Sequence, residues 1–99
     1  MKELLKGIDK TKPIILLDHQ PFDLTSAVTE NVDLQLSGHT HSGQLFPFNF
    51  VTGKMFEEDW GFLKKGNTNF YVSCGFGTWG PPIRIGSHSE IVNFKIEFL

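Results

Sequence analysis

Two prolines bracket the segment that most limits how this chain can fold. Between Pro13 and Pro21 the sequence reads IILLDHQ, which begins with a continuous apolar run. So short a run without polar alternation predicts a β-strand covered on both faces, in a sheet that lies between other layers. The residue before Pro13 is pushed out of the helical region, so a preceding helix must end there.

Helices and strands alternate around this segment. Residues 2–9 place three apolar side chains on one face and predict an amphipathic helix. Residues 23–31 predict a second, short helix with Asp23 as its N-cap. Residues 32–37 alternate apolar and polar side chains and predict a second strand. This rhythm is typical of a layered α/β protein.

The second half of the chain is less regular. Residues 42–68 have no clean period and predict a long functional loop, with a short hairpin near residues 50–62. A strand is expected at residues 69–75, followed by a second irregular loop. Residues 90–98 alternate apolar and polar side chains and predict a final strand.

Size and charge narrow the functional classes. The 99 residues make one small domain or a piece of a larger one. A net charge of −2 lacks the basic footprint of nucleic-acid binders. The N-terminus lacks the apolar core of a secretion signal, and no run approaches the roughly 18 apolar residues of a membrane span. Localisation stays open between cytoplasmic and membrane-peripheral.

Three of the four histidines directly follow strand-like segments: His19, His39 and His41. Open α/β sheets bind ligands beyond the carboxyl ends of their strands. The two histidines of Gly-His-Thr-His are separated by one residue, which places their Cα atoms about 6–7 Å apart in extended chain. That spacing suits two metal ions about 3.5–4 Å apart, with one histidine to each.

The residues around these histidines carry a family resemblance. SGHTHSGQ after an LxLS strand resembles the last metal motif of the calcineurin-like metallophosphoesterases, and LLDHQP resembles the motif before it. NFYVSCGFGTWGPPIRIG followed by SEI is similar to the C-terminal part of the YkuE-like branch. The resemblance covers residues 13–98 approximately, which is almost the whole chain.

The resemblance implies an α/β/β/α sandwich, a mixed sheet with flanking helices, of which this chain would be the C-terminal half. It also implies two divalent metal ions, drawn from Mn, Fe, Zn and Ni. By the same resemblance, His19 and His39 would ligate one ion and His41 the other. The implied activity is hydrolysis of a phosphomonoester or phosphodiester by a metal-activated hydroxide.

Three motifs of that family are missing from this sequence. They are Asp-x-His, Gly-Asp-x-x-Asp and Gly-Asn-His, which supply the remaining ligands and the general acid. We therefore expect residues 1–99 to be one C-terminal segment with the N-terminal half absent, with partial or no metal occupancy and no activity alone. The alternative is a non-catalytic α/β module with a partial metal site that binds a partner or self-associates through an exposed sheet edge.

Several further residues have both a functional and a structural interpretation. Gln44 either lines the substrate site or forms hydrogen bonds within a loop, and Arg84 either meets a substrate phosphate or forms a salt bridge. Asp18 either orients a neighbouring histidine or is a solvated strand end. His88 is expected on a surface loop, and Cys74 is expected to be buried.

Ten large apolar side chains crowd into residues 45–63. They could form an apolar lip that accepts a lipid-like phosphoester or rests on a membrane surface. They could also pack on the chain itself or on the absent half. We favour packing, because large exposed apolar patches are rare on soluble monomers.

Overall fold

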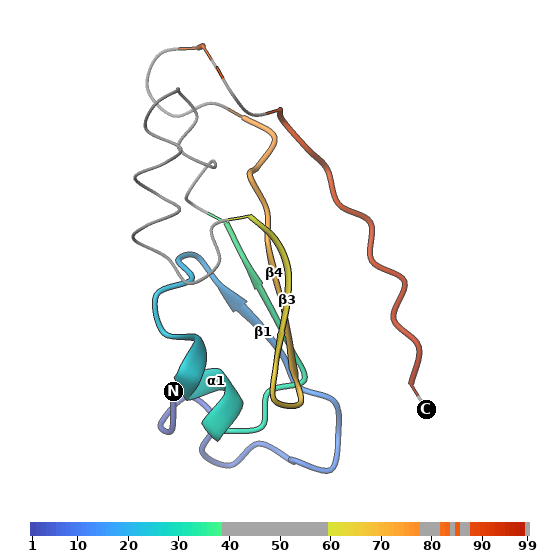
Figure 1. Cartoon of the computed structure of the whole chain (residues 1–99). Coiled ribbons are helices and arrows are strands. Elements are labelled where there is room, and N and C mark those ends of the chain that lie inside the picture. Colours follow the sequence, from blue (N-terminus) through green and yellow to red (C-terminus); the bar gives the residue numbers. More distant parts are fainter. Residues whose placement is uncertain (39–59, 78–81, 84, 86–87, 99) are drawn as a thin grey trace.

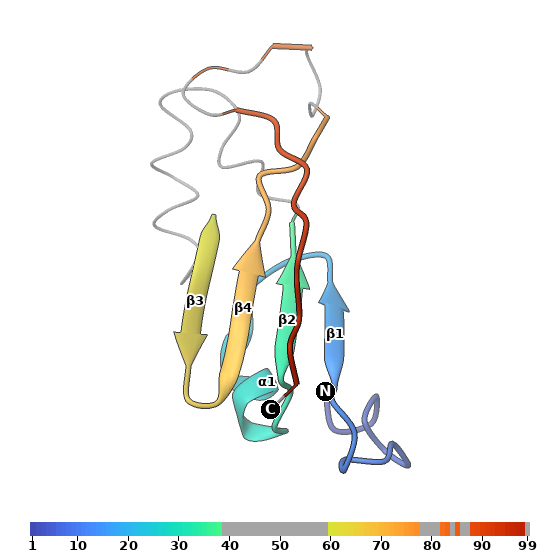
Figure 2. The ribbon, with the colours of Figure 1, turned by 90° about the vertical axis from the view of Figure 1, so that its right-hand side faces the viewer.

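A computed structural model describes residues 1–38, 60–77, 82–83, 85 and 88–98 of this protein. The described residues contain a mixed four-stranded sheet and one helix. The order of strands is β1-β2-β4-β3, with β1, β2 and β4 parallel and β3 antiparallel to β4 (Figure 2). The elements are β1 (Ile15–Asp18), α1 (Leu24–Thr29), β2 (Leu34–Ser37), β3 (Gly61–Lys65) and β4 (Thr68–Val72). The predicted α/β class is confirmed.

Helix α1 makes the crossover that joins the parallel strands β1 and β2. A parallel pair needs such a crossover, because the chain must return to the same end of the sheet. The helix begins after Asp23, whose carboxylate accepts a hydrogen bond from the Ser26 N–H at 3.1 Å, so the predicted N-cap is confirmed. The hydroxyl and the N–H of Ser26 both lower the pKa of the Asp23 carboxyl.

The core lies between α1 and one face of the sheet. The strand register places Leu16 of β1 beside Gln35 of β2, and Gln35 beside Phe70 of β4, so these side chains share a face. The buried cluster on this face consists of Leu5, Ile14, Leu16, Leu24, Ala27, Val32 and Phe70. The burial of this single apolar layer is the main source of stability in the described part.

The other face of the sheet is only partly covered. Residues 90–98 cross it on the side opposite α1 (Figures 1 and 2), and Phe94 packs edge-on against Tyr71 at a ring-centroid distance of 5.2 Å. Ile15 and Leu17 of β1 are nevertheless 47% and 76% exposed. The prediction that β1 is covered on both faces is therefore wrong for the residues the structure describes, because the layer over this face is incomplete.

Residues 90–98 run extended but join no strand ladder within the described ranges. The prediction of a strand there is not met. Alternating side chains describe the two faces of a strand, but a strand also needs a neighbour that accepts its backbone hydrogen bonds. This segment passes over the sheet face instead of along an edge (Figure 2).

A hairpin occupies the end of the region that was predicted to be a loop. Residues 61–65 form β3, which pairs with β4 through a two-residue connection, Gly66-Asn67. Gly66 has φ +60°, as the first central position of a type II′ turn requires. The sequence feature that indicates this hairpin is Gly66, which lies between two short strand-forming segments. The remainder of the predicted loop and hairpin, residues 42–59, lies outside the described residues.

Residues 2–9 form turns where a helix was predicted. The Leu5 N–H donates to the Met1 carbonyl in the helical pattern, but the Lys6 and Ile8 N–H groups donate to carbonyls only three residues back. Gly7 then has φ +83°, which ends any right-handed helix.

We expect Gly66→Ala to destabilise the chain by about 1–2 kcal/mol, the typical cost of placing an L residue in the left-handed region. The added Cβ would also lie 3.1 Å from the Val28 Cγ1 atom. Urea unfolding measures the change. Gly77→Ala is the matched control, because a Cβ there meets nothing within 4 Å. Equal unfolding midpoints for the two variants would contradict the turn assignment.

Candidate metal centre at the carboxyl ends of the strands

The parallel strands β1, β2 and β4 end side by side. His19 follows β1, Gly38 follows β2 and Ser73 follows β4. The Gly38 N–H donates to the His19 carbonyl at 3.3 Å, and the Ser73 N–H donates to the Ser37 carbonyl at 2.8 Å. These backbone hydrogen bonds bring the three strand ends to one edge of the sheet, where open α/β sheets bind their ligands.

His19 is exposed at this edge. Of the predicted ligands and substrate contacts, it alone falls within the described ranges. His39, His41, Gln44 and Arg84 lie outside them, so their approach to His19 stays a prediction.

No group of three His, Cys, Asp or Glu side chains within the described ranges could hold a metal ion. Two neighbouring strand ends nevertheless fit a shared histidine site. A backbone hydrogen bond joins Gly38 to His19, and the residue that follows Gly38 in the sequence is His39. Neutral imidazole suits Zn, Ni, Fe and Mn, so the chemistry of the donors agrees with a divalent transition metal.

A buried polar cluster lies beneath this edge. The Gln35 side chain is 1% exposed, and its Nε2 donates to Asp18 Oδ2 at 3.4 Å and to Ser37 Oγ at 3.3 Å. Both bonds are long, but together they tie the end of β1 to the end of β2. Asp18 therefore contacts the neighbouring strand beside His19. No sequence signal marked Gln35 as buried, because the alternation of residues 32–37 placed it on the polar face of the strand, and only its register with Leu16 and Phe70 turns it toward the core.

A second polar cluster lies at the end of β4 and was missed by sequence reasoning. Glu90 Oε1 accepts hydrogen bonds from Trp60 Nε1 at 3.2 Å and from the Cys74 N–H at 3.1 Å. The Tyr71 hydroxyl lies 3.4 Å from each carboxylate oxygen. The sequence feature that could have indicated this cluster is Glu90, the acidic residue of the segment SEI.

The two remaining candidates behave as predicted. Cys74 is buried, and its Sγ donates to the His88 carbonyl at 2.8 Å. The His88 residue itself is exposed. Neither contributes to a metal-binding group within the described ranges.

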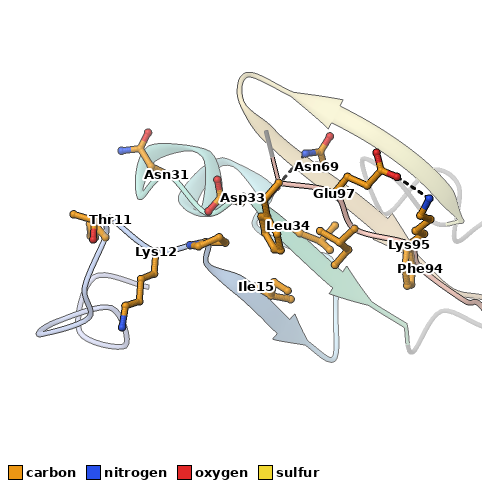
Figure 3. Close-up of a pocket in the computed structure, with 14 residues that line it drawn as sticks. Thr11, Lys12, Ile15, Asn31, Asp33, Leu34, Asn69, Phe94, Lys95 and Glu97 are labelled. Carbon is orange, nitrogen blue, oxygen red and sulfur yellow. Dashed lines mark hydrogen bonds and ion pairs between the residues drawn. The ribbon is translucent and has the colours of Figure 1, made fainter.

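One hollow lies at the opposite, amino ends of the strands. Figure 3 shows Ile15 and Leu34 of the sheet on one side of it and Phe94, Lys95 and Glu97 of the C-terminal segment on the other. Lys95 and Glu97 form an exposed ion pair at 2.7 Å. The hollow is the space that residues 94–98 leave above β1 and β2, and it is remote from His19.

The chain is similar to bacterial and animal proteins whose names contain the word metallophosphoesterase. It is 44% identical over 94 residues to an uncharacterized metallophosphoesterase of Helicobacter pylori, covering 93% of this chain and 25% of that protein. It is 39% identical over 100 residues to a transmembrane protein with metallophosphoesterase domain of Danio rerio, covering 98% of this chain and 23% of that protein. It is 38% identical over 89 residues to the uncharacterized metallophosphoesterase YkuE of Bacillus subtilis, covering 84% of this chain and 30% of that protein.

The chain thus spans about a quarter of the length of the curated relatives it matches first. No protein-family model and no solved structure matches it. In the part of the chain that the structure describes, no helix has the length and apolar character needed to cross a membrane.

Proposed function

Because this chain is the C-terminal segment of a metallophosphoesterase, we propose that it supplies part of a dinuclear metal site that hydrolyses phosphoesters. The observation that carries the proposal is the shared edge of the sheet. There His19 and the residue preceding His39 are joined by a backbone hydrogen bond. Proteins of this family in general use divalent metal ions. The number of ions in this protein and their identity are part of the proposal.

His19 and His39 hold one ion and His41 holds the other. Bound Mn, Fe, Zn or Ni ions supply Lewis acidity and a nucleophile at neutral pH, because metal binding lowers the pKa of water to about 7. Gln44 and Arg84 orient the phosphate oxygens, the arginine through its planar fork of N–H donors. The other ligands and the proton donor come from the Asp-x-His, Gly-Asp-x-x-Asp and Gly-Asn-His motifs of an N-terminal half.

The proposal is tested on the complete protein, meaning the open reading frame that contains this chain together with any codons upstream. We expect those three motifs upstream, and we expect Mn-, Zn- or Ni-dependent hydrolysis of p-nitrophenyl phosphate or bis(p-nitrophenyl) phosphate. The two probes separate monoesterase from diesterase activity. We expect the 99-residue chain alone to show no turnover. A complete protein that has the motifs but neither binds metal nor turns over either probe would overturn the proposal.

Self-association is the alternative function, and the bare sheet face favours it. Leu17 and Phe62 on that face are 76% and 63% exposed, and Ile91 on the C-terminal segment is 84% exposed. Apolar surface of this kind recruits partners. The partner most readily available to cover this face in the isolated chain is a second copy of the same chain.

We expect the isolated chain to sediment as a dimer or larger species at high concentration. Leu17→Glu should shift it toward monomer, because a buried unpaired carboxylate is costly. Leu17 is already exposed in the single chain, so circular dichroism should show an unchanged fold. Lys64→Glu on the same face of the neighbouring hairpin is the polar control. A wild-type chain that stays monomeric throughout would count against self-association.

A further inference from the structure

Glu90 joins three separate parts of the chain through one carboxylate. Its donors are Trp60, just before β3, Tyr71 within β4, and the Cys74 backbone just after β4. The Glu90 backbone is also attached to the end of β4, because its N–H donates to the Gly75 carbonyl at 2.9 Å. The C-terminal segment is thus attached to the end of β4 at its first residue.

Glu90 remains ionised in this position. Burial by itself would raise the pKa of its carboxyl, but the hydrogen bonds from the Cys74 N–H, the Trp60 indole and the Ser73 hydroxyl together hold that pKa below its ordinary value. Burial, and then the negative charge of Glu90, raise the pKa of Tyr71. Hydrogen bonds to an ionised acceptor are about twice as strong as neutral ones. The contacts from the Cys74 N–H at 3.1 Å and the Trp60 indole at 3.2 Å are therefore the main attachment, and the Tyr71 hydroxyl at 3.4 Å adds a longer one.

The backbone held by Glu90 adjoins the candidate metal centre. Cys74 follows Ser73, whose N–H donates to the Ser37 carbonyl and whose own carbonyl oxygen lies 3.8 Å from the Cβ position of Gly38. Gly38 in turn donates to the His19 carbonyl. A short chain of contacts therefore leads from the Glu90 carboxylate to the strand end that carries His19.

We propose that Glu90 is a positioning residue of the phosphoesterase site, fixing the backbone at the end of β4 against the strand ends at Gly38 and His19. This inference rests on the proposed function. Removing the carboxylate leaves the Cys74 N–H without its acceptor, and the Cys74 residue is only 4% exposed. An unpaired buried N–H is costly, so the backbone must move to find another partner.

The test compares Glu90→Gln with the wild-type complete protein. The amide preserves the volume and keeps an oxygen acceptor for the Cys74 N–H, but it removes the negative charge that strengthens the hydrogen bonds to Glu90. Supporting groups behind metal ligands typically contribute about 10–100-fold to metal affinity or activity. We expect the Mn dissociation constant to rise and kcat to fall within that range, with KM for the phosphoester changed less than about threefold. Glu90→Ala should have a larger effect.

Glu97→Gln is the matched control, because Glu97 lies on the same segment, pairs with Lys95 and is 66% exposed in its side chain. It should leave the Mn dissociation constant and kcat unchanged. Circular dichroism on each variant keeps loss of fold separate from loss of positioning, since a purely structural role would lower the folded fraction without changing the metal affinity of the folded protein.

The outcomes separate this inference from the proposed function. A wild-type complete protein with neither metal binding nor turnover overturns both. An active wild-type protein with a folded Glu90→Gln variant of unchanged metal affinity and kcat overturns the Glu90 inference alone. Should Glu90→Gln unfold, Glu90→Asp keeps the charge but draws the carboxylate back from the Cys74 N–H. A folded Glu90→Asp variant with unchanged metal affinity would then overturn the inference.

Discussion

Replacing both histidines of the Gly-His-Thr-His motif, His39→Ala with His41→Ala, should abolish metal binding by the complete protein and lower kcat/KM by more than about a hundredfold. The lower bound follows from supporting residues, whose loss already costs about 10–100-fold. Loss of a direct ligand from each of two metal positions must cost more. Elemental analysis and Mn, Zn and Ni titrations measure the first effect, and phosphoester hydrolysis measures the second.

His88→Ala is the control for this pair, because His88 is exposed and its backbone carbonyl, which accepts from Cys74, is kept in the variant. It should keep both metal content and turnover. Retention of two metal ions by the double variant would contradict the assignment of His39 and His41. Loss of metal from His88→Ala to the same degree would place the site elsewhere.

The same titrations on the 99-residue chain measure how much of the site it holds by itself. Three histidines without a bridging carboxylate should bind Zn or Ni weakly or not at all. Weak binding that disappears in the double variant would place a metal at this motif. Full occupancy of two ions by the short chain would contradict the view that an N-terminal half supplies the remaining ligands.

The second large effect concerns the core, where Phe70→Ala should unfold the isolated chain. Phe70 is 1% exposed and lies on the face of the sheet that packs against α1. Truncating a buried phenylalanine costs about 3–5 kcal/mol. A small domain has only about 5–15 kcal/mol of stability to lose, and a chain with one covered sheet face should lie at or below the lower end.

Urea unfolding followed by circular dichroism measures this change, and Phe76→Ala is its control. Phe76 is 72% exposed, so its truncation should change the free energy of unfolding by less than about 0.5 kcal/mol. Equal effects of the two substitutions would mean that the layer between α1 and the sheet is not the core.

Residues 14–37 were readable because their signals are local, whereas the helix predicted for residues 2–9 did not form. The apolar run before His19, the Asp23 cap and the alternation of residues 32–37 each describe a single element and its ends. The structure contains β1, α1 and β2 at those places, within the usual uncertainty at element ends. The parallel pairing of β1 and β2 then places the two strand ends side by side.

Errors arose where an element depends on a neighbour distant in the sequence. Residues 61–65 are a strand because β4 pairs with them, and residues 90–98 carry a strand pattern without a described neighbour to pair with. The apolar character of Ile15 and Leu17 predicted a covering layer, which residues 90–98 provide only in part. In β2 even the choice of face was decided by neighbouring strands, because the polar Gln35 and Ser37 are buried while Leu34 and Leu36 are only half-buried.

The sequence by itself indicated the family, through motifs that resemble it, and it predicted the α/β class and the position of His19 at the end of β1, because those properties depend on residues close together in the chain. Only the tertiary structure decided that Gln35 links Asp18 to Ser37 beneath the site and that Glu90 gathers Trp60, Tyr71 and Cys74 at the end of β4. Each of those hydrogen-bonded groups joins residues from separate segments of the chain. Their partners are chosen by the packing of the sheet, which brings together atoms that no local pattern relates.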